Sequence, residues 1–429
     1  MKLLVIGSGG REHALVWRLS LSPRVKKIYV SPGNAGTANN DRIENISETD
    51  INDLINFAKI HNINMTIVGP EAPLAAGIVD NFREAGLKIF GPTKAAAQLE
   101  SSKIFAKNFM IKHKIPTAKY ACFENAVEAH NYIDNEEMPI VIKVDGLASG
   151  KGVVVAKSKE EAHDAINKFT NNFYSQNILI EEYLEGEEAS FIVMSDGTNV
   201  LALATSQDHK RLLDEDLGPN TGGMGAYSPA SIITPDIYNR IMRDVILPTI
   251  NGMSKDGIPF TGFLYAGVMI SNKLNNSAEK DIKILEFNCR IGDPEAQPIM
   301  MRMKTDLVDI FEHAINNSLD KAEIMWDRRT AVGVVIASKG YPDNPELGFP
   351  ITGLPKDTDE CVVFHSATKK LNNEIITSGG RVLCVTTLGD SIRIAREKAY
   401  DIISNIHFDG MQYRKDIGWR AMKSNKKNN

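Results

Sequence analysis

The sequence has few cysteines, and their spacing excludes the roles that cysteine most often plays. Only four occur among 429 residues, and no two of them form a C-x-x-C pair: Cys122, Cys289, Cys361 and Cys384. Such scattered positions indicate neither a disulfide framework nor a zinc site. We therefore expect reduced thiols and a cytoplasmic protein.

Long apolar runs and an excess of positive charge are also missing. Only four apolar residues, Leu3–Ile6, precede the first glycine, which is too few for a signal peptide. No run approaches the roughly 18 apolar residues that a membrane-spanning helix needs. With 49 Lys and Arg against 54 Asp and Glu, the net charge is −5. We therefore expect neither a membrane nor a nucleic acid as a partner.

Short apolar runs do alternate with helical patterns over residues 1–90. Strands are predicted at Leu3–Ile6, Lys27–Val30, Thr66–Val68 and Lys88–Phe90, with helices between them at Glu12–Leu21, Ile51–Ile60 and Ala72–Ala85. This order predicts an open parallel sheet that binds ligands at the carboxyl ends of its strands. Beyond Trp326, the runs Ala331–Ala337, Cys361–Ser366 and Val382–Thr387 and the helical pattern Ile392–Ile403 predict an α+β domain without visible chemistry.

Three loops fall at the carboxyl ends of the predicted parallel strands: Gly7–His13, Ser31–Gly36 and Gly69–Pro73. The first resembles the dinucleotide motif G-x-G-x-x-G, but Glu12 replaces its last glycine, and Ser31 stands where an acid for the ribose is expected. A nicotinamide dinucleotide is therefore disfavoured. A helix that begins at Gly10–Arg11 offers N–H groups and a cation to a small phosphate ester. A tight turn with a solvated arginine is the alternative.

A glycine-rich hairpin is the most distinctive feature of the sequence. Pro139–Val155 reads P-I-V-I-K-V-D-G-L-A-S-G-K-G-V-V-V, which predicts two strands around a flexible loop. Its glycines let backbone N–H groups approach an anion, and Lys143 and Lys151 supply charges for phosphate. It is not a P-loop, because the glycine spacing is one residue short and a strand follows in place of a helix.

Two further stretches fit a nucleotide. Lys103 falls in the first turn of a helix capped by Ser101 or Ser102, where it opposes the helix dipole unless an anion is close. The extended run Ile178–Leu184 could offer its backbone to an adenine edge, and Glu188 could accept both ribose hydroxyls. A surface lysine and an amphipathic strand with an acidic turn remain the alternatives.

Polar residues mark two more candidate sites. Asp208–Pro229 is a long, polar, glycine-rich stretch that we interpret as a substrate loop. Thr261–Ile270 and Ile282–Arg290 read as two strands, and in the second the period of two places Glu286, Asn288 and Arg290 on one face. A carboxylate and an amide oxygen suit Mg²⁺, and the arginine suits a carboxylate or phosphate. A solvated outer sheet face is the alternative.

Taken together, these stretches resemble the ATP-grasp superfamily and, within it, the glycinamide ribonucleotide synthetase family. The resemblance is nearly full length. Its motifs are G-S-G-G-R-E-H, S-P-G-N-A-G, V-G-P-E-A-P-L, V-I-K-V-D-G-L-A-S-G-K-G-V-V-V, E-E-Y-L-E-G-E-E-A-S, D-H-K-R, G-P-N-T-G-G-M-G-A-Y-S-P and L-E-F-N-C-R-I-G-D-P-E. Their number and order make the resemblance specific.

The resemblance implies a multidomain α/β and α+β fold. We expect a Rossmann-like substrate domain over residues 1–100, an ATP-grasp domain over 101–325 with a mobile lid subdomain at about 120–188, and an α+β domain over 326–429. It also implies ATP and Mg²⁺ or Mn²⁺, with Glu286 and Asn288 as metal ligands. Many ATP-grasp enzymes carry another acid on the preceding strand, but Thr261–Ile270 has none, so a ligand for a second metal ion is missing there.

The implied ATP-binding residues are Lys103, Lys143, Gly146, Ser149, Gly150, Lys151, Gly152, Glu181, Glu182, Tyr183, Leu184 and Glu188. The implied substrate-binding residues are Gly9, Gly10, Arg11, Asn34, Gly36, Pro70, Glu71, Asp293, Pro294 and Glu295. Lys143, Arg290 and Asp214 are the expected catalytic residues, because the carboxylate and ammonium of glycine need an arginine with an acid, either Asp214 or Asp293.

The implied reaction joins glycine to 5-phosphoribosylamine through a glycyl phosphate and yields glycinamide ribonucleotide, ADP and phosphate. Such phosphoryl transfer needs alignment and charge neutralisation rather than a nucleophilic triad. We expect a monomer. The alternatives are an ATP-grasp ligase or carboxylase for another purine precursor, an oxidoreductase that uses the N-terminal sheet, and a protein that binds ATP without turnover.

Overall fold

The N-terminal region forms the open parallel sheet that the alternation predicts. The computed structural model describes residues 1–38, 41–147, 152–172, 177–275 and 279–427. The five parallel strands lie in the order β3-β2-β1-β4-β5. They are β1 (Lys2–Gly7), β2 (Lys27–Pro32), β3 (Ile43–Asn45), β4 (Met65–Val68) and β5 (Ile89–Phe90). The helices around them are α1 (Gly10–Ser20), α2 (Ile51–Ile60), α3 (Glu71–Ala76) and α4 (Ile78–Glu84).

One predicted helix is divided in two. Residues 72–85 were expected to form a single helix, but Gly77 adopts a left-handed conformation with φ of 94° and separates α3 from α4. A glycine reaches this conformation without steric cost, so it can end one helix and begin another. The prediction of an uninterrupted helix is therefore wrong.

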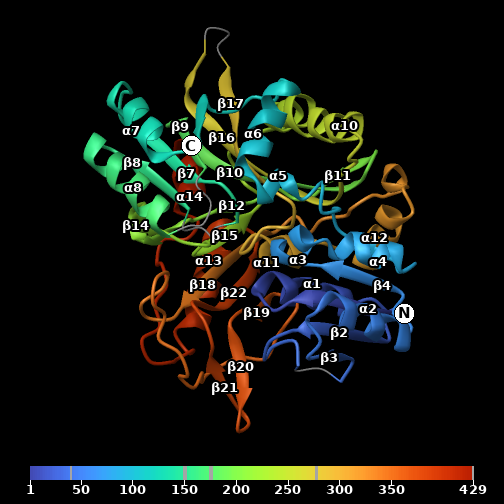
Figure 1. The fold of residues 1–429 in the computed structure, drawn as a ribbon. Coiled ribbons are helices and arrows are strands. Elements are labelled where there is room, and N and C mark those ends of the chain that lie inside the picture. The colour runs from blue at the N-terminus through green and yellow to red at the C-terminus, as the bar shows by residue number, and fades with distance from the viewer. Residues whose placement is uncertain (39–40, 148–151, 173–176, 276–278, 428–429) are drawn as a thin grey trace.

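The glycine-rich hairpin belongs to a four-stranded antiparallel sheet with the order β6-β9-β7-β8. Its strands are β6 (Tyr120–Phe123), β7 (Ile140–Val144), β8 (Val153–Ala156) and β9 (Ile178–Glu182). Two helices, α7 (Ala126–Asp134) and α8 (Lys159–Asn172), pack on one face of the sheet around Ile142, Ile166 and Phe169. In Figure 1 this subdomain stands to one side of the molecule.

The central sheet has the order β11-β10-β16-β17 and is antiparallel. Its strands are β10 (Glu187–Asp196), β11 (Val200–Ala202), β16 (Thr261–Leu274) and β17 (Lys280–Asn288). One face packs against helices whose side chains share its core, including Phe109, Ile241 and Ile250. These helices are α5 (Gln98–Ser101), α6 (Lys103–Lys112), α9 (Pro235–Ile241), the π-helical η2 (Met242–Ile246) and α10 (Leu247–Lys255).

The third large sheet joins segments that lie far apart in the chain. Its order is β12-β15-β18-β22-β19, with the strands β12 (Gln207–Asp208), β15 (Gly225–Ser228), β18 (Thr330–Ala337), β19 (Cys361–His365) and β22 (Arg381–Gly389). Helix α13 (Ile392–Ile403) covers it around Val334, Val385 and Ala399. Two of its strands therefore precede residue 326, where we expected the C-terminal domain to begin.

The remaining elements connect these sheets. They are β13 (Arg211–Leu213), η1 (Asp214–Asp216), β14 (Leu217–Asn220), α11 (Ala296–Arg302), α12 (Leu307–Ile315), η3 (Leu319–Lys321), β20 (Thr368–Leu371), β21 (Glu374–Thr377) and α14 (Trp419–Lys427). The stretch Asp208–Pro229 is thus folded into short strands around a β13–β14 hairpin, contrary to the expected loop. Within the described ranges, no helix is long and apolar enough to cross a membrane.

Candidate active site

Two lysines pair with one buried carboxylate where α6 meets the lid sheet, and a third, Lys103, interacts with it electrostatically. Glu181 lies with its Oε2 atom 3.0 Å from Nζ of Lys107 and its Oε1 atom 2.9 Å from Nζ of Lys143. Lys107 also donates to Oγ1 of Thr117 at 2.7 Å. Burial lowers the pKa of Lys107 to about 8, and it also lowers the pKa of Lys103. Partly desolvated ammonium groups such as these can bind the negatively charged oxygens of a phosphate.

Asp145 explains how a lysine can open helix α6. Its Oδ1 atom accepts hydrogen bonds from the backbone N–H of Lys103 at 2.6 Å and of Ile104 at 3.3 Å, so a residue of the lid caps this helix. Ser102 supplies the expected N-cap by accepting from Phe105 N–H at 3.1 Å. The ammonium of Lys103 donates to the carbonyl of Gly146 at 2.7 Å. The carboxylate of Asp145 therefore offsets the unfavourable position of Lys103 on the helix dipole.

The predicted adenine segment divides into two parts. Glu181 and Glu182 are inside strand β9, where their backbones pair with β7, and the side chain of Glu182 binds Lys283 at 2.5 Å. Tyr183 and Leu184 follow the strand and lie outside it, and the Tyr183 side chain is exposed. The backbones of Tyr183 and Leu184 are therefore the part of the segment that lies outside the β9 pairing.

The described part of the glycine-rich hairpin ends at Leu147 and resumes at Gly152. Gly146 has φ of 97°, a conformation that side-chain-bearing residues rarely adopt, and an added Cβ there would meet nothing within 4 Å. Gly152 is buried and directly precedes β8. Ser149, Gly150 and Lys151 lie outside the described residues.

A second cluster forms on the neighbouring strands β10, β16 and β17. The Lys210 ammonium lies 2.5 Å from Oε1 of Glu188 and 3.5 Å from Oε1 of Glu286. Gly267 pairs with Glu286 in the sheet, and a Cβ there would lie 3.4 Å from both Glu188 and Glu286, at ordinary contact distance. Although burial opposes its charge, Lys210, Lys143, Lys103 and Arg290 lower the pKa of Glu286 to about 2. Glu286 is therefore ionised at any physiological pH.

Glu286 and Asn288 make a small donor set. No group of three or more His, Cys, Asp and Glu side chains that could hold a metal ion occurs among the described residues. One carboxylate and one amide oxygen nevertheless fit Mg²⁺, which retains water and takes its other ligands from phosphates. A β-bulge beside Leu285 shifts the alternation of β17, and the carbonyl of Leu285 accepts a hydrogen bond from Lys143 at 3.3 Å.

Arg290 lies between two carboxylates that come from the region before the lid. Its Nε atom is 3.1 Å from Glu71 and 3.3 Å from Glu100. Glu100 also accepts the backbone N–H of Cys289 at 2.6 Å. Burial raises the pKa of Glu100, whereas Arg290 and then Arg11 lower the pKa of Glu71 against the effect of burial. These contacts fix the guanidinium at the junction of the parallel and central sheets.

The predicted N-terminal substrate loops are organised by Glu12. Its carboxylate accepts from the backbone N–H of Gly9 at 2.6 Å and from Nε of Arg11 at 2.5 Å, and a Cβ at Gly69 would overlap it. The acid that replaces the third glycine of the dinucleotide motif therefore fills the space under two loops. Arg11 is buried and paired, so the alternative of a solvated arginine is wrong.

The rest of these loops pack against the C-terminal sheet. The Asn34 amide donates to the carbonyls of Ser8 at 2.8 Å and His365 at 2.9 Å, and its oxygen accepts from Gly36 N–H at 2.9 Å. The side chain of Asn34 is therefore committed to holding the loop. A Cβ on Gly10 would lie 2.6 Å from Oγ of Ser366, so this glycine packs closely against the C-terminal region. Pro70, in another of these loops, directly precedes α3.

The turn Asp293-Pro294-Glu295 is held by a residue of the C-terminal region. Arg381 donates to the carbonyls of Asp293 at 2.6 Å and Gly222 at 2.7 Å, and its other terminal nitrogen lies 3.3 Å from the Asp293 carboxylate. Glu295 is buried and accepts from Ser190 at 2.8 Å. The C-terminal domain, in which no chemistry was expected, thus reaches the candidate site.

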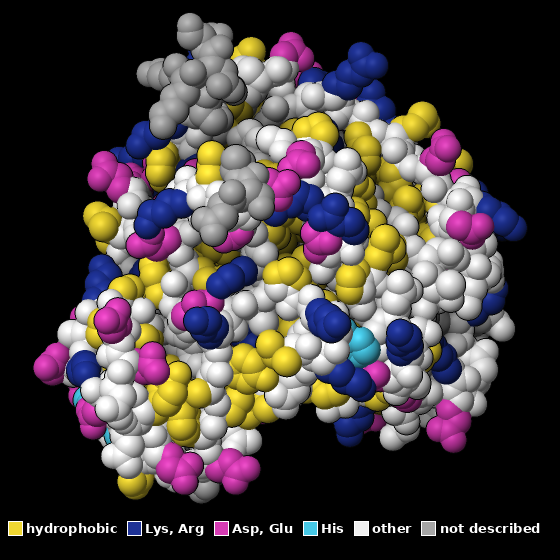
Figure 2. Space-filling model, turned by 90° about the horizontal axis from the view of Figure 1, so that it is seen from above, with side chains coloured by type: hydrophobic (Ala, Val, Ile, Leu, Met, Phe, Trp, Pro, Cys, Tyr) yellow, Lys and Arg dark blue, Asp and Glu magenta, His cyan; other side chains and the backbone are white. Residues whose placement is uncertain are grey.

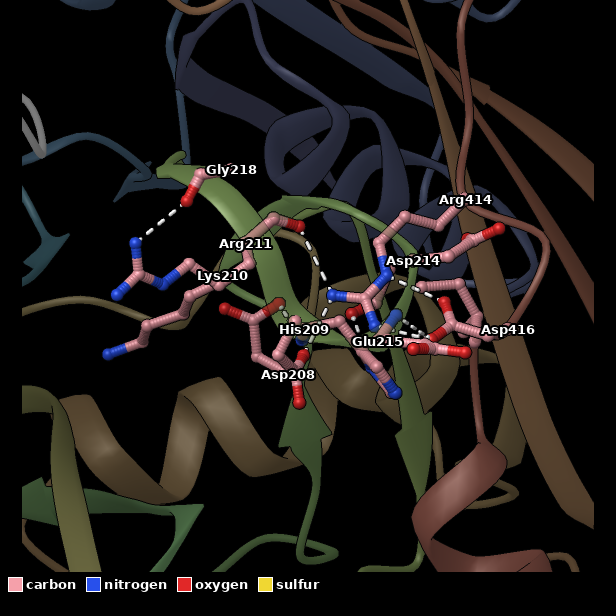
Figure 3. Close-up of polar contacts among 12 residues, drawn as sticks. Asp208, His209, Lys210, Arg211, Asp214, Glu215, Gly218, Arg414 and Asp416 are labelled. Carbon is pink, nitrogen blue, oxygen red and sulfur yellow. Dashed lines mark hydrogen bonds and ion pairs between the residues drawn. The ribbon is translucent and has the colours of Figure 1, made fainter.

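Asp214 is placed elsewhere. Its carboxylate accepts the backbone N–H of Lys415 at 2.7 Å, within the contact between the β13–β14 hairpin and the C-terminal segment (Figure 3). Of the two acids offered as partners of Arg290, Asp293 is the one on which Arg290 acts electrostatically.

Sequence reasoning missed Glu100, Lys107 and Arg381. Lys107 could have been found, because it follows Lys103 by one helical turn and shares its face. Glu100 and Arg381 carry no local signal, since their partners lie 190 residues (Glu100 to Arg290) and 88 residues (Arg381 to Asp293) away in the chain. On the face shown in Figure 2, basic and acidic side chains are interspersed.

Comparison with known proteins gives three matching family models. They are the phosphoribosylglycinamide synthetase N domain over residues 1–100, its ATP-grasp (A) domain over residues 101–296 and its C domain over residues 331–420.

Individual relatives agree with these matches. A protein of Ralstonia nicotianae named phosphoribosylamine–glycine ligase is 60% identical over 99% of this chain and 100% of its own length. A protein of the same name from Escherichia coli O157:H7 is 52% identical over 98% of this chain and 99% of its own length. The crystal structure of phosphoribosylamine–glycine ligase from Thermotoga maritima is 33% identical in sequence and has a TM-score of 0.83. The match covers 97% of this chain and 100% of the other. A biotin carboxylase of Campylobacter jejuni shares the fold alone, at 15% identity and a TM-score of 0.72. The match covers 97% of this chain and 93% of the other.

Proposed function

The chain belongs to the phosphoribosylglycinamide synthetase family, the family that the motifs indicated, and from this we infer that it ligates glycine to 5-phosphoribosylamine with ATP. It is an ATP-dependent carboxylate–amine ligase of purine biosynthesis, whose products are glycinamide ribonucleotide, ADP and phosphate. The observation that best supports a phosphoryl-transfer site is the convergence of cations on Glu286. Lys103, Lys143, Lys210 and Arg290 come from four separate places in the chain and all act on this carboxylate.

ATP-grasp enzymes use ATP with a divalent metal ion, and we assign the nucleotide to the space between the lid and central sheets. Lys103 and Lys143 would bind phosphates, the backbone of Tyr183 and Leu184 the adenine, and Glu188 the ribose. Glu286 and Asn288 would hold Mg²⁺ or Mn²⁺, which supplies neutralisation of phosphate charge. Lys107 keeps Glu181 and Lys143 in place beneath the phosphates.

The reaction follows from the weakness of a carboxylate as an electrophile. A glycine carboxylate oxygen attacks the γ-phosphorus, the bond to the bridging oxygen breaks, and ADP leaves. The amine nitrogen of phosphoribosylamine then attacks the glycyl carbon, the carbon–oxygen bond to phosphate breaks, and the nitrogen loses a proton. In this proposal Arg290, fixed by Glu71 and Glu100, binds the carboxylate, and Asp293 faces the glycine ammonium.

The assignment of substrates is tested by the dependence of ADP release on each of them. We expect release to require both glycine and phosphoribosylamine, with alanine a poor substitute because its methyl group crowds the acceptor site. Positional isotope exchange in labelled ATP should depend on glycine if the glycyl phosphate forms reversibly. Equal turnover with glycine, alanine and bicarbonate would overturn this assignment and leave only an ATP-grasp enzyme of other specificity.

A further inference from the structure

The segment Arg414–Arg420 binds the β13–β14 hairpin at several points, one at the start of β13 and the others in the connecting turn η1. Arg414 donates to the carbonyl of Arg211 at 3.2 Å and to Oδ1 of Asp216 at 2.9 Å. Asp416 accepts the backbone N–H of Glu215 at 2.9 Å, and Arg420 pairs with Asp216. Figure 3 shows Arg414 and Asp416 beside Asp214 and Glu215.

Three consecutive residues connect this contact to the candidate active site. The Nε2 atom of His209 accepts the backbone N–H of Gly418 at 3.1 Å, and the carbonyl of Arg211 accepts from Arg414. Between them, Lys210 extends away from Arg414 toward Glu188 and Glu286 (Figure 3). Both chain neighbours of Lys210, His209 and Arg211, are therefore hydrogen-bonded to the C-terminal segment.

The contact is centred on a buried guanidinium, whereas the side chains of Asp416, Arg420 and Asp216 are 19%, 20% and 27% exposed. The Arg414 side chain has no exposed surface and forms a two-pronged pair with Asp416 at 2.7 and 2.8 Å. His209 is also buried, and burial lowers its pKa to about 3, so it stays neutral and accepts from Gly418. A planar guanidinium fork fixes direction as well as distance.

We propose that Arg414 is a positioning residue that fixes the backbone around Lys210 and thereby sets the ammonium between Glu188 and Glu286. This inference rests on the proposed function, since it concerns the residues assigned to ribose and metal. Loosening Arg414 lets Lys210 shift, which disturbs nucleotide binding before it disturbs the fold. A purely structural role predicts a smaller folded fraction with an unchanged KM.

The test is a double-mutant cycle on the full chain. Arg414→Lys retains the charge but removes the fork, and Lys210→Met removes the ammonium. The control is Arg329→Lys, because Arg329 forms a similar fork with Asp327 at 3.1 and 2.9 Å, with its side chain 30% exposed, and contacts none of the described residues assigned to the site. For each protein, KM for ATP, kcat and the affinity for MgADP by calorimetry are measured.

We expect Arg414→Lys and Lys210→Met each to raise KM for ATP by about tenfold, and the double variant to resemble Lys210→Met alone, because coupled residues are not additive. Arg329→Lys should leave KM and MgADP affinity unchanged. Additive effects of the two changes, or a lower kcat at constant KM in Arg414→Lys, would overturn the proposal.

Two provisions keep the outcome decisive. If Arg414→Lys does not fold, Asp416→Asn loosens the same fork with a nearly isosteric side chain, and the same cycle is run with it. MgADP affinity is read without turnover. A wild-type chain that binds MgADP but shows no glycine-dependent ADP release would contradict the proposed function, whereas additivity in an active enzyme would contradict only the positioning role.

Discussion

At the scale of single residues, Glu286 is the side chain on which the site most depends. We predict that Glu286→Ala retains the fold but loses about two orders of magnitude in turnover, because the metal loses its carboxylate and the surrounding cations lose their counter-charge. Excess Mg²⁺ should rescue it poorly. Steady-state kinetics and circular dichroism measure both effects. The control is Glu185→Ala, an exposed glutamate paired with Lys273. Wild-type turnover in a folded Glu286→Ala protein would remove this residue from the site.

Three buried histidines make a prediction about pH. Burial lowers the pKa of His13 and His209 to about 3 and of His365 to about 4. Below pH 6.5 these histidines bind protons in the unfolded chain but stay neutral in the folded chain. The free energy of unfolding therefore falls as pH decreases from 6.5 toward 4. Each histidine should contribute about 2 kcal/mol of this loss at pH 5. Urea unfolding at pH 7 and pH 5 measures it, and a His209→Gln variant should show a smaller loss. Equal pH dependence in both proteins would refute the role of His209.

Some of these residues could be predicted from the sequence, and others could not. The period of two in a strand placed Glu286 and Asn288 on one face, and the glycine pattern singled out Lys143. Neither carboxylate that holds Arg290 was predicted as its partner: Glu71 was expected to bind substrate because it belongs to a recognisable motif, whereas Glu100 lies in a short helix with no distinguishing pattern. Local periodicity gives the direction of a side chain, but only the packed fold gives the group that it meets.

At the scale of elements, the lid and helix α6 are joined by a cap. We predict that Asp145→Ala destabilises the protein by about 0.5–2 kcal/mol, because the first turn of α6 loses an acceptor, and also raises KM for ATP, because Lys103 is released. Urea unfolding and steady-state kinetics measure the two effects. Asp50→Ala is the matched control, since Asp50 caps α2 by accepting from Asn52 N–H at 2.8 Å. That change should lower stability alone; a similar rise in KM in both variants would contradict the assignment.

Element prediction succeeded where pattern and capping agreed. Helices α2 and α13 have the predicted bounds, and Ser391 caps α13 by accepting from Ile394 N–H. It failed for Asp208–Pro229, whose strands are two to four residues long, and of which β15 pairs with β18 more than a hundred residues downstream. Strands this short have no periodicity of their own, so their glycines and charges were interpreted as a loop.

At the scale of the whole molecule, the C-terminal sheet should make the domains inseparable. We predict that a chain ending at Trp326 aggregates and binds no MgADP, because β15 loses its partner β18 and the Asp293 turn loses Arg381. Size-exclusion chromatography with light scattering measures the aggregation, and calorimetry measures the binding of MgADP. A chain ending at Lys423 is the control and should keep turnover and, like the full chain, elute as a monomer. A soluble, nucleotide-binding chain ending at Trp326 would contradict the prediction.

The contact between Arg211 and Arg414 has a consequence for the order in which the protein is made. The two residues are 203 positions apart. A ribosome adds about 5–20 residues per second, so the peptide around Lys210 emerges about 10–40 s before the segment that fixes it. For the last part of that interval, after Glu286 and Asn288 have been added, the nascent chain holds the assigned nucleotide residues without the contact that fixes Lys210. By the positioning role proposed above, we expect such a chain to bind ATP more weakly than one that includes Arg414.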